Sequence, residues 1–390
     1  METTKLKTYI QSANVNFLFG SGLSKPYLET LGDIEKRLTK LSKGGINENI
    51  RDIIKASIYK EYFTKVILPN FNPDENNADY NGVIDNYKSF LSLWNDIFNK
   101  RHNRLLSKQL NVYTANIDIF VEKAAEKAKV EFNDGFKGSI QQFFDEGNFQ
   151  KSYSKTSLYF QNVSELPVFN LLKMHGSINW IEKENIIYND YSLQLVETIS
   201  KELNTVEKTH FIAFEKFTAM KKNAATLQMD NPKIDYSSIY KDFFEAYNKL
   251  IIVNPTKRKF SETVLDIHFY ELMRLYSNSL EKENSILFVM GFSFADEHIR
   301  KITLRAANTN PTLLIVIFAY DDDQKFEFEN NISNSNIIVL TPSKFKETNK
   351  ADEKAIAKKE LLQNLKHFDL ETINRVFSLI NNEIPINYGK

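Results

Sequence analysis

Two short segments of the sequence combine residue types that suit hydrolytic chemistry. One reads TANID and places Asn116 and Asp118 two positions apart, so both side chains can face one side of a turning segment. The other reads KMHGS and contains His175, whose neutral imidazole can act as a general base near pH 7. A simpler interpretation stays open for each segment: an Asx turn and helix N-cap for the first, and a structural histidine for the second.

A glycine-containing segment, GSGLS, directly follows the apolar run NVNFLF. Gly20 and Gly22 allow a tight turn, and free backbone amides in such a turn can bind phosphate oxygens. The third glycine of the usual dinucleotide-binding motif is absent, so an ordinary turn is the alternative. Ser24 can contact phosphate or cap the segment that follows.

A second glycine segment, GFSFADEH, follows the apolar run SILFVM. Gly291 and Ser293 at the end of a strand suit contacts to phosphate or ribose. Asp296 can either cap the helix EHIRKITLRAA or touch a ligand. His298 falls in the first turn of that helix, where a cation is disfavoured, so we expect a structural role for it.

These four segments each come at or just after the end of an expected strand. Apolar runs of strand length alternate with helix-length segments, which predicts a parallel sheet with helices on both faces. Ligands bind outside the carboxyl ends of such strands, so the four segments should converge on one crevice. The expected strands cover residues 15–19, 112–114, 168–172, 250–253, 286–290, 313–318 and 337–340.

The fold class expected is therefore α/β, a Rossmann-like doubly wound parallel sheet with helical insertions and no zinc ribbon. The main domain should cover residues 1–345, with a helical insertion at 47–110 and a small insertion at about 179–242. A C-terminal helical segment should follow at 346–390. A helix is also expected over 260–283, where apolar residues recur at helical spacing.

Composition excludes several classes of site. The 390 residues include no cysteine, which rules out disulfides, thiol nucleophiles and cysteine-bound zinc. The formal net charge is zero, so nucleic acid is not directly indicated as a partner, and the short basic run at 257–259 suits a solvated loop. No secretion signal or membrane-length apolar run is evident, which predicts a cytoplasmic protein without membrane contact.

The ordered set GSGLS, TANID, KMHGS and GFSFAD resembles the motifs of the sirtuin family. The resemblance spans about residues 14–320. It implies that Asn116 orients the attacking water and the nicotinamide ribose, that Asp118 lies by the carboxamide and that His175 is the catalytic base. NAD is then the substrate and no metal is needed. The residues expected to contact NAD are Gly20, Ser21, Gly22, Ser24, Thr114, Asp118, Gly291, Ser293 and Asp296.

Two departures from the family pattern bear on the reaction. The four zinc-binding cysteines of protein-deacylating sirtuins are absent, and KPYLETLGD replaces the expected Pro-Asp-Phe-Arg segment. In both respects the chain resembles the bacterial anti-phage sirtuin-like domains. This resemblance implies an NAD hydrolase that acts by depleting NAD. Alternatives are a protein deacylase or ADP-ribosyltransferase, or a non-catalytic nucleotide-binding subunit.

The chain's size resembles that of the sirtuin partner of a HerA-type ATPase. This implies a homo-oligomer that works with such an ATPase, because a hydrolase of NAD must be held off in healthy cells. The stretch 47–110 and the segment after Lys344 are candidate contact surfaces, or they simply complete the fold.

Overall fold

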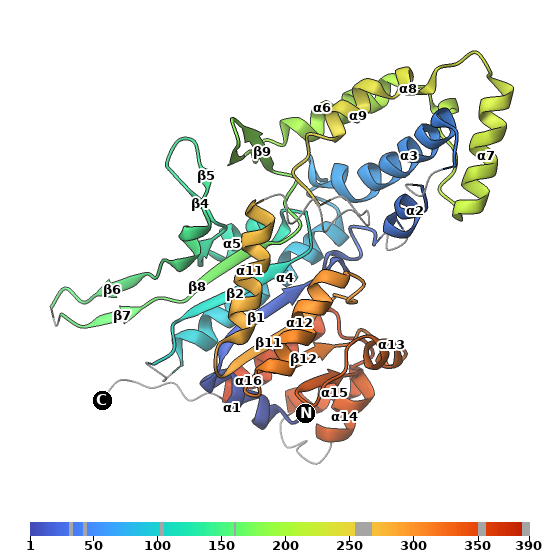
Figure 1. Cartoon of the computed structure of the whole chain (residues 1–390). Helices are drawn as coiled ribbons and strands as arrows, with labels where there is room; N and C mark the ends of the chain where they lie inside the picture. The colour runs from blue at the N-terminus through green and yellow to red at the C-terminus, as the bar shows by residue number, and fades with distance from the viewer. Residues whose placement is uncertain are drawn as a thin grey trace.

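Apolar residues predominate in most strands of the central sheet, as expected for parallel strands covered on both faces. NVNFLF forms β1 (Asn14–Phe19) and SILFVM forms β11 (Ser285–Met290), and nearly every residue in both is buried. The computed structural model describes residues 1–30, 34–41, 45–101, 105–159, 161–253, 267–349 and 356–383 (Figure 1).

In the described residues, seven parallel strands form the central sheet in the order β13-β12-β11-β1-β2-β8-β3. Without the edge strand β3, numbering the others along the chain gives the order 3-2-1-4-5-6 of a dinucleotide-binding Rossmann fold. The chain order reverses between β1 and β11, and the crevice of such a sheet lies at this point. The other strands are β2 (Gln109–Thr114), β3 (Glu131–Asn133), β8 (Val168–Lys173), β12 (Leu314–Phe318) and β13 (Ile337–Leu340).

Two hydrophobic cores lie on opposite faces of this sheet, which confirms the doubly wound arrangement. Phe17 and Phe19 of β1 belong to one core, and the intervening Leu18 belongs to the other. The first core holds helices α1 (Thr3–Ser12), α4 (Ala78–Asn99), α5 (Phe120–Ala128), α14 (Pro342–Asn349), α15 (Ile356–Asn364) and α16 (Leu370–Glu383). The second holds α11 (Ile267–Glu281), α12 (Glu297–Thr309) and α13 (Gln324–Asn331).

Helices α4 and α16 complete the fold of the sheet domain. The ring of Trp94 on α4 packs edge-on against Phe377 of α16 and against Phe17 of β1, with centroid distances of 4.8 Å in both cases. The expected insertion at 47–110 therefore contains elements of two different cores, because α4 packs on the sheet and α3 (Glu48–Tyr62) packs elsewhere.

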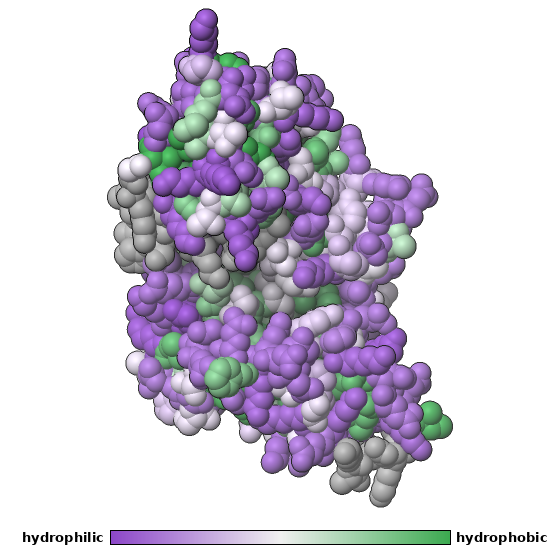
Figure 2. All heavy atoms as spheres, turned by 90° about the vertical axis from the view of Figure 1, so that its right-hand side faces the viewer, coloured by the Kyte–Doolittle hydropathy of each residue, from purple (hydrophilic) through white to green (hydrophobic). Residues whose placement is uncertain are grey.

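A helical lobe with its own core lies above the carboxyl ends of the strands (Figure 1). It is built from two distant parts of the chain, 34–71 and 193–252, and its core also includes Ile117, Ile119 and Ile178 from the strand-end loops. Figure 2 shows the surface hollowed between this lobe and the sheet domain below it. The lobe comprises α2 (Ile34–Leu41), α3, α6 (Gln194–Thr205), α7 (Phe217–Asp230), α8 (Tyr236–Ile239) and α9 (Lys241–Tyr247).

Two smaller sheets flank the main one. A hairpin of β6 (Ser154–Thr156) and β7 (Val163–Glu165) projects from the body at the left of Figure 1. The second sheet contains β4 (Phe136–Lys137), β5 (Phe143–Phe144), β9 (Trp180–Lys183) and β10 (Ile186–Asn189).

The strand expected at 250–253 is wrong. These residues form no strand of the sheet and make only a single antiparallel bridge, between Gly176 and Ile252. They cross the loop after β8, where the amide of Ser177 donates to the carbonyl of Ile251 (3.2 Å) and that of Val253 to the carbonyl of His175 (2.9 Å). Their apolar side chains are buried against the lobe and the second core, which explains the strand-like pattern. The helix expected over 260–283 is confirmed over residues 267–281, which form α11, while 254–266 lie outside the described residues.

Candidate functional site

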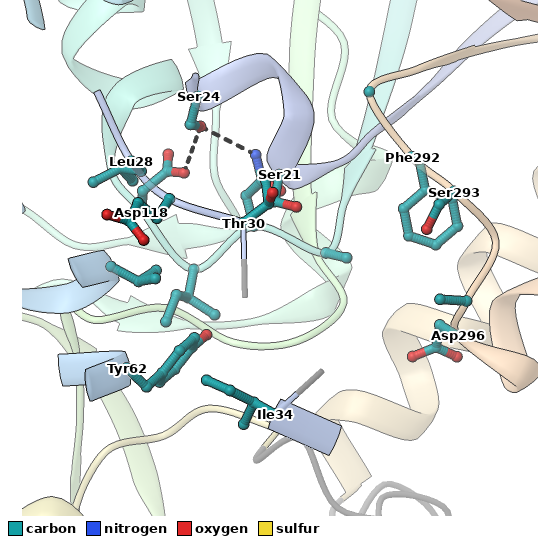
Figure 3. A pocket seen from close by; sticks show the side chains of 17 residues that line it. Ser21, Ser24, Leu28, Thr30, Ile34, Tyr62, Asp118, Phe292, Ser293 and Asp296 are labelled. Atoms are coloured by element: carbon teal, nitrogen blue, oxygen red, sulfur yellow. Dashed lines mark hydrogen bonds between the residues drawn. The ribbon is translucent and has the colours of Figure 1, made fainter. Parts of the chain in front are cut away.

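A cavity of about 230 Å³ lies at the carboxyl ends of β1, β2 and β11. Its walls come from three strand-end loops and from the lobe, and Figure 3 shows Asp118 and Ser24 across from Tyr62. The lining residues are Ser21, Ser24, Leu28, Glu29, Thr30, Ile34, Tyr62, Val66, Ala115, Asn116, Ile117, Asp118, Gly291, Phe292, Ser293, Ala295 and Asp296.

The glycines after β1 are required by the loop after β11. A Cβ at residue 20 would collide with the carbonyl oxygen of Gly291, and one at residue 22 would lie 3.0 Å from the Gly291 Cα. The amide of Gly20 donates to the Met290 carbonyl (3.0 Å), and that of Gly22 to the Gly291 carbonyl (3.1 Å). These two amides therefore join the loops, unlike the free amides expected for phosphate binding.

Asn116 links the loops after β1 and β2. Its Nδ2 donates to the carbonyl of Gly20 (3.2 Å) and to Ser24 Oγ (3.4 Å). Its own amide donates to Thr114 Oγ1 (2.9 Å), so Thr114 supports Asn116 from behind the cavity. The N-cap of α5 is Ile119, so the helix-cap part of the simpler interpretation of TANID is wrong, whereas its Asx-turn part is confirmed at Asp118, whose Oδ1 accepts a hydrogen bond from the Phe120 amide.

Asp118 is a buried carboxylate in the wall of the cavity. Its Oδ2 accepts a hydrogen bond from Ser24 Oγ (2.8 Å), and its Oδ1 accepts one from the Phe120 amide (3.3 Å). Burial raises the pKa of Asp118, and the positive charge of Lys173 and these hydrogen bonds oppose that rise. Burial and the negative charge of Asp118 raise the pKa of the Tyr62 phenol, which therefore stays protonated and able to donate.

Lys173 lies behind this wall and joins three elements. Its Nζ is 2.5 Å from the Asp118 carbonyl oxygen, 2.6 Å from Ser177 Oγ and 2.5 Å from Glu122 Oε1 on α5. Burial raises the pKa of Glu122, and Lys173 partly offsets this rise. One buried ammonium thus fixes the TANID turn relative to the loop that carries His175.

His175 contacts Asp296, and Asp296 lines the cavity. Its Nε2 lies 3.0 Å from Asp296 Oδ2, and both side chains are about nine-tenths buried. Asp296 is the N-cap of α12, because its Oδ1 accepts hydrogen bonds from the amides of His298 (2.9 Å) and Ile299 (3.2 Å). The cap interpretation of Asp296 is thereby confirmed, and His298 lies in the first turn of α12 as expected.

The structure brings most of the expected residues to one place. Ser21, Ser24, Asn116, Asp118, Gly291, Ser293 and Asp296 line the cavity, His175 joins it through Asp296, and Gly20, Gly22 and Thr114 lie behind it. Sequence reasoning missed Tyr62, Lys173 and Glu122. Of these, only Lys173 carried a usable signal, as a charged residue between the apolar run VFNLL and the histidine.

The part of the chain that the structure describes contains no group of three or more His, Asp or Glu side chains placed to hold a metal ion. Among the described helices, none is both long enough and apolar enough to cross a membrane.

Fold and site together define a doubly wound α/β protein whose crevice lies at the switch point of the sheet. No family model matches the chain, and no curated protein matches it either. Functional inference therefore depends on the site itself.

Proposed function

We propose that this protein binds NAD and hydrolyses its nicotinamide–ribose bond. The observation that carries the proposal is that three strand-end segments line one cavity and that His175, from the fourth segment, contacts it through Asp296. There Asn116 and Asp118 line the same cavity as Asp296, which holds His175. The sheet order is also that of dinucleotide-binding folds, whose ligands occupy this position.

The chemistry needs few groups. The C1′–N bond of the nicotinamide riboside breaks with its electron pair moving to the cationic ring nitrogen, which becomes neutral. An oxocarbenium-like ribose results, as in glycoside hydrolysis, and water forms the new C1′–O bond. In this proposal Asn116 orients the water and the ribose, and His175 accepts the proton of the water.

The cavity suits one end of NAD. Its volume of about 230 Å³ is below the roughly 300–1,000 Å³ usual for small-molecule sites. The nicotinamide riboside would therefore lie inside, with Leu28 and Tyr62 against its rings and Asp118 near its carboxamide. The pyrophosphate would extend along the strand-end loops, where the hydroxyls of Ser21 and Ser293 offer hydrogen bonds.

The sirtuin resemblance extends this proposal to a cellular role. We infer an anti-phage effector that depletes NAD, works as a homo-oligomer and is controlled by a HerA-type ATPase. One face of α4 and one face of α16 are buried in the sheet core, so contacts to such partners would use their exposed faces or other surfaces. Light scattering of the chain, alone and with the ATPase, tests the assembly.

One assay separates the possible activities. The purified chain is incubated with NAD, and the products are resolved by chromatography. Free nicotinamide and ADP-ribose in equal amounts support hydrolysis, and transfer to an added protein or acyl-peptide would instead support ADP-ribosyl transfer or deacylation. Binding of NAD without turnover, with and without the ATPase, would overturn the proposed hydrolysis. His367→Ala is a matched control for histidine variants, because its exposed ring stacks on Tyr320 and neither residue lines the cavity.

A further inference from the structure

Four asparagines lie side by side on four adjacent strands of the central sheet. Asn16 of β1 and Asn111 of β2 are register partners, and so are Asn111 and Asn170 of β8. Asn133 of β3 is the partner of Asn170 on its other side. We call these four residues the asparagine rung. Asn111 is partly buried and the other three are at most 4% exposed, so their amides need hydrogen-bond partners inside the protein.

The side-chain amides of the asparagine rung are joined by hydrogen bonds that all run in one direction. Nδ2 of Asn111 donates to Asn16 Oδ1 (3.0 Å), and Nδ2 of Asn170 donates to Asn111 Oδ1 (3.0 Å). Nδ2 of Asn133 donates to Asn170 Oδ1 (3.1 Å). Backbone groups fix the direction at both ends, because Asn16 Nδ2 faces main-chain carbonyls of β1 and β11 (both 3.4 Å) and Asn133 Oδ1 accepts from the Gly135 amide (3.1 Å).

A change of register would break several of these bonds at once. Moving one strand by a single residue turns its side chains to the opposite face, whereas moving it by two residues, about 6.6 Å, keeps the faces as they are. After a two-residue shift, Asn111 would lie opposite Val168 or Leu172 instead of Asn170. Unpaired buried amides are costly, and a buried asparagine specifies register in coiled coils in this way. The asparagine rung therefore disfavours registers that apolar side chains alone would permit.

The register of these strands also sets the heights at which the site segments leave the sheet. Phe19, Thr114 and Lys173 end β1, β2 and β8, each three positions after a rung asparagine, and they are again register partners. Thr114 Oγ1 donates to the Phe19 carbonyl (3.3 Å), and the Met174 amide donates to the Thr114 carbonyl (2.9 Å). The site segments begin here, so displacing one strand would move its segment relative to the other two.

We propose that the asparagine rung is a positioning device for the crevice. It fixes the register of β1, β2, β8 and β3, so that the segments after β1, β2 and β8 meet at set heights. The rung lies three residues below the strand ends and outside the lining of the cavity, so Asn16, Asn111 and Asn170 are positioning residues. The inference on register stands on the sheet alone, and its consequence for turnover rests on the proposed hydrolysis of NAD.

Two variants separate positioning from a contribution to stability. Asn170→Val leaves Asn111 Oδ1 without its donor, so it should lower the urea midpoint of unfolding. Replacing Asn16, Asn111 and Asn170 together with valine removes matching donors and acceptors, and Asn133 keeps the Asn148 carbonyl as an acceptor (2.9 Å). The urea midpoint of this triple variant should therefore exceed that of Asn170→Val, because replacing both partners of a buried hydrogen bond by apolar groups is nearly neutral.

Asn310→Val is the matched control. Asn310 is also a buried asparagine, but its Nδ2 donates to two main-chain carbonyls at the end of α11 (both 2.8 Å) and not to the asparagine rung. It ends α12 on the side opposite to Asp296. This variant should lower the urea midpoint without moving the site segments.

The first measurement is kcat with NAD, under conditions where each variant is folded. We expect kcat to fall at least about tenfold in Asn170→Val and to stay low in the triple variant, because small displacements of catalytic groups are costly. Asn310→Val should keep the wild-type kcat. If the triple variant regains the wild-type kcat, or if Asn170→Val matches Asn310→Val, the positioning role is overturned while the proposed hydrolysis stands. A wild type that releases no nicotinamide under any condition overturns the proposed function instead.

Register is measured separately, without NAD, by NMR of the full chain labelled at valine and leucine methyl groups. Val112 of β2 and Leu171 of β8 are register partners in one core, so their methyl groups should give a nuclear Overhauser contact. Their signals are assigned by their loss in Val112→Ile and Leu171→Ile. We expect this contact and single signals in the wild type and in Asn310→Val.

In the triple variant we expect loss of the contact between Val112 and Leu171, or more than one set of their signals. A triple variant with the wild-type contact and single signals would overturn the inference, whatever the kinetics show. If the triple variant does not fold, Asn170→Val is compared with Asn310→Val in the same way, and identical contacts and signals in these two would overturn it.

Discussion

Lys173 Nζ lies 2.5 Å from Glu122 Oε1, and both side chains are buried behind the cavity. The same ammonium reaches the carbonyl of Asp118, so one positive charge faces two buried carboxyl-bearing residues. Breaking a buried pair by removing one partner is costly, because the other charge is left uncompensated. The pair therefore controls both stability and the shape of the cavity wall.

Removing the ammonium should make stability depend on pH. In Lys173→Met, the already raised pKa values of Glu122 and Asp118 should rise further, above their values in the unfolded chain. A raised carboxyl pKa means that the folded state binds protons more tightly, so stability is present at low pH and lost as pH rises through the folded pKa. We expect a loss of about 3–5 kcal/mol at pH 8 and a smaller loss at pH 5.5, measured by urea unfolding.

A double variant provides the control. Lys173→Met with Glu122→Gln removes both charges, and its stability at pH 8 should exceed that of Lys173→Met alone. Equal losses at the two pH values, or additive losses in the double variant, would contradict the buried-pair explanation.

Gly176 should tolerate no side chain. Gly176→Ala forces a Cβ into a left-handed conformation and against the Ile251 carbonyl, which should cost at least ~1–2 kcal/mol. Gly82 is the matched control: it lies in α4 with open space at its Cβ position, so Gly82→Ala should stabilise by about 0.5–1 kcal/mol. Thermal unfolding compares the two, and similar shifts for both would show that the 251–253 contact does not constrain the His175 loop.

Six of the seven strands described in the main sheet could be predicted because buried parallel strands are rich in apolar residues, whereas the short edge strand β3, which reads EFN, was not expected. The same rule failed at 250–253, since an apolar run crossing a loop between two cores has the same composition as a buried strand. Local sequence carries no information on which partner such a segment will meet. In the structure the partner of 250–253 is the loop after β8, to which backbone hydrogen bonds with His175 and Ser177 join it.

The positions of the site residues could be predicted because ligands bind outside the carboxyl ends of parallel strands. The contacts between these residues could not be predicted in this way. The contact of His175 with Asp296 depends on how α12 leaves the sheet, which no local pattern encodes. Tyr62 was missed because the lobe assembles from 34–71 and 193–252, and only tertiary packing brings it over the crevice. The glycine turns were predicted to provide free amides for phosphate. In the structure the glycines are required because the loops after β1 and β11 pack too closely to leave room for a Cβ.

Tyr62 should contribute to substrate binding from the lobe. Its ring forms part of the cavity wall opposite Asp118, and its phenol stays protonated because burial raises its pKa. Tyr62→Ala should raise KM for NAD about tenfold by removing one aromatic wall, while Tyr62→Phe should keep most of the binding. Steady-state kinetics with NAD measure this, and unchanged KM in Tyr62→Ala would exclude the ring from the substrate site.

Asn116 and His175 should differ in how their loss affects folding. Each alanine variant should lower NAD cleavage at least ~100-fold, as expected for loss of a positioned catalytic group. Asn116→Ala also removes the hydrogen bonds to Gly20 and Ser24 that join two strand-end loops, so it should lose about 1–3 kcal/mol of stability.

Asn116→Asp keeps the size of the side chain but replaces the amide donor with an acceptor facing the Gly20 carbonyl, so it should be no more active than Asn116→Ala. Nicotinamide release and urea unfolding, measured on the same preparations, test these expectations. Wild-type rates in Asn116→Asp would show that the amide is not the group that orients water, and wild-type rates in His175→Ala would remove the proposed base.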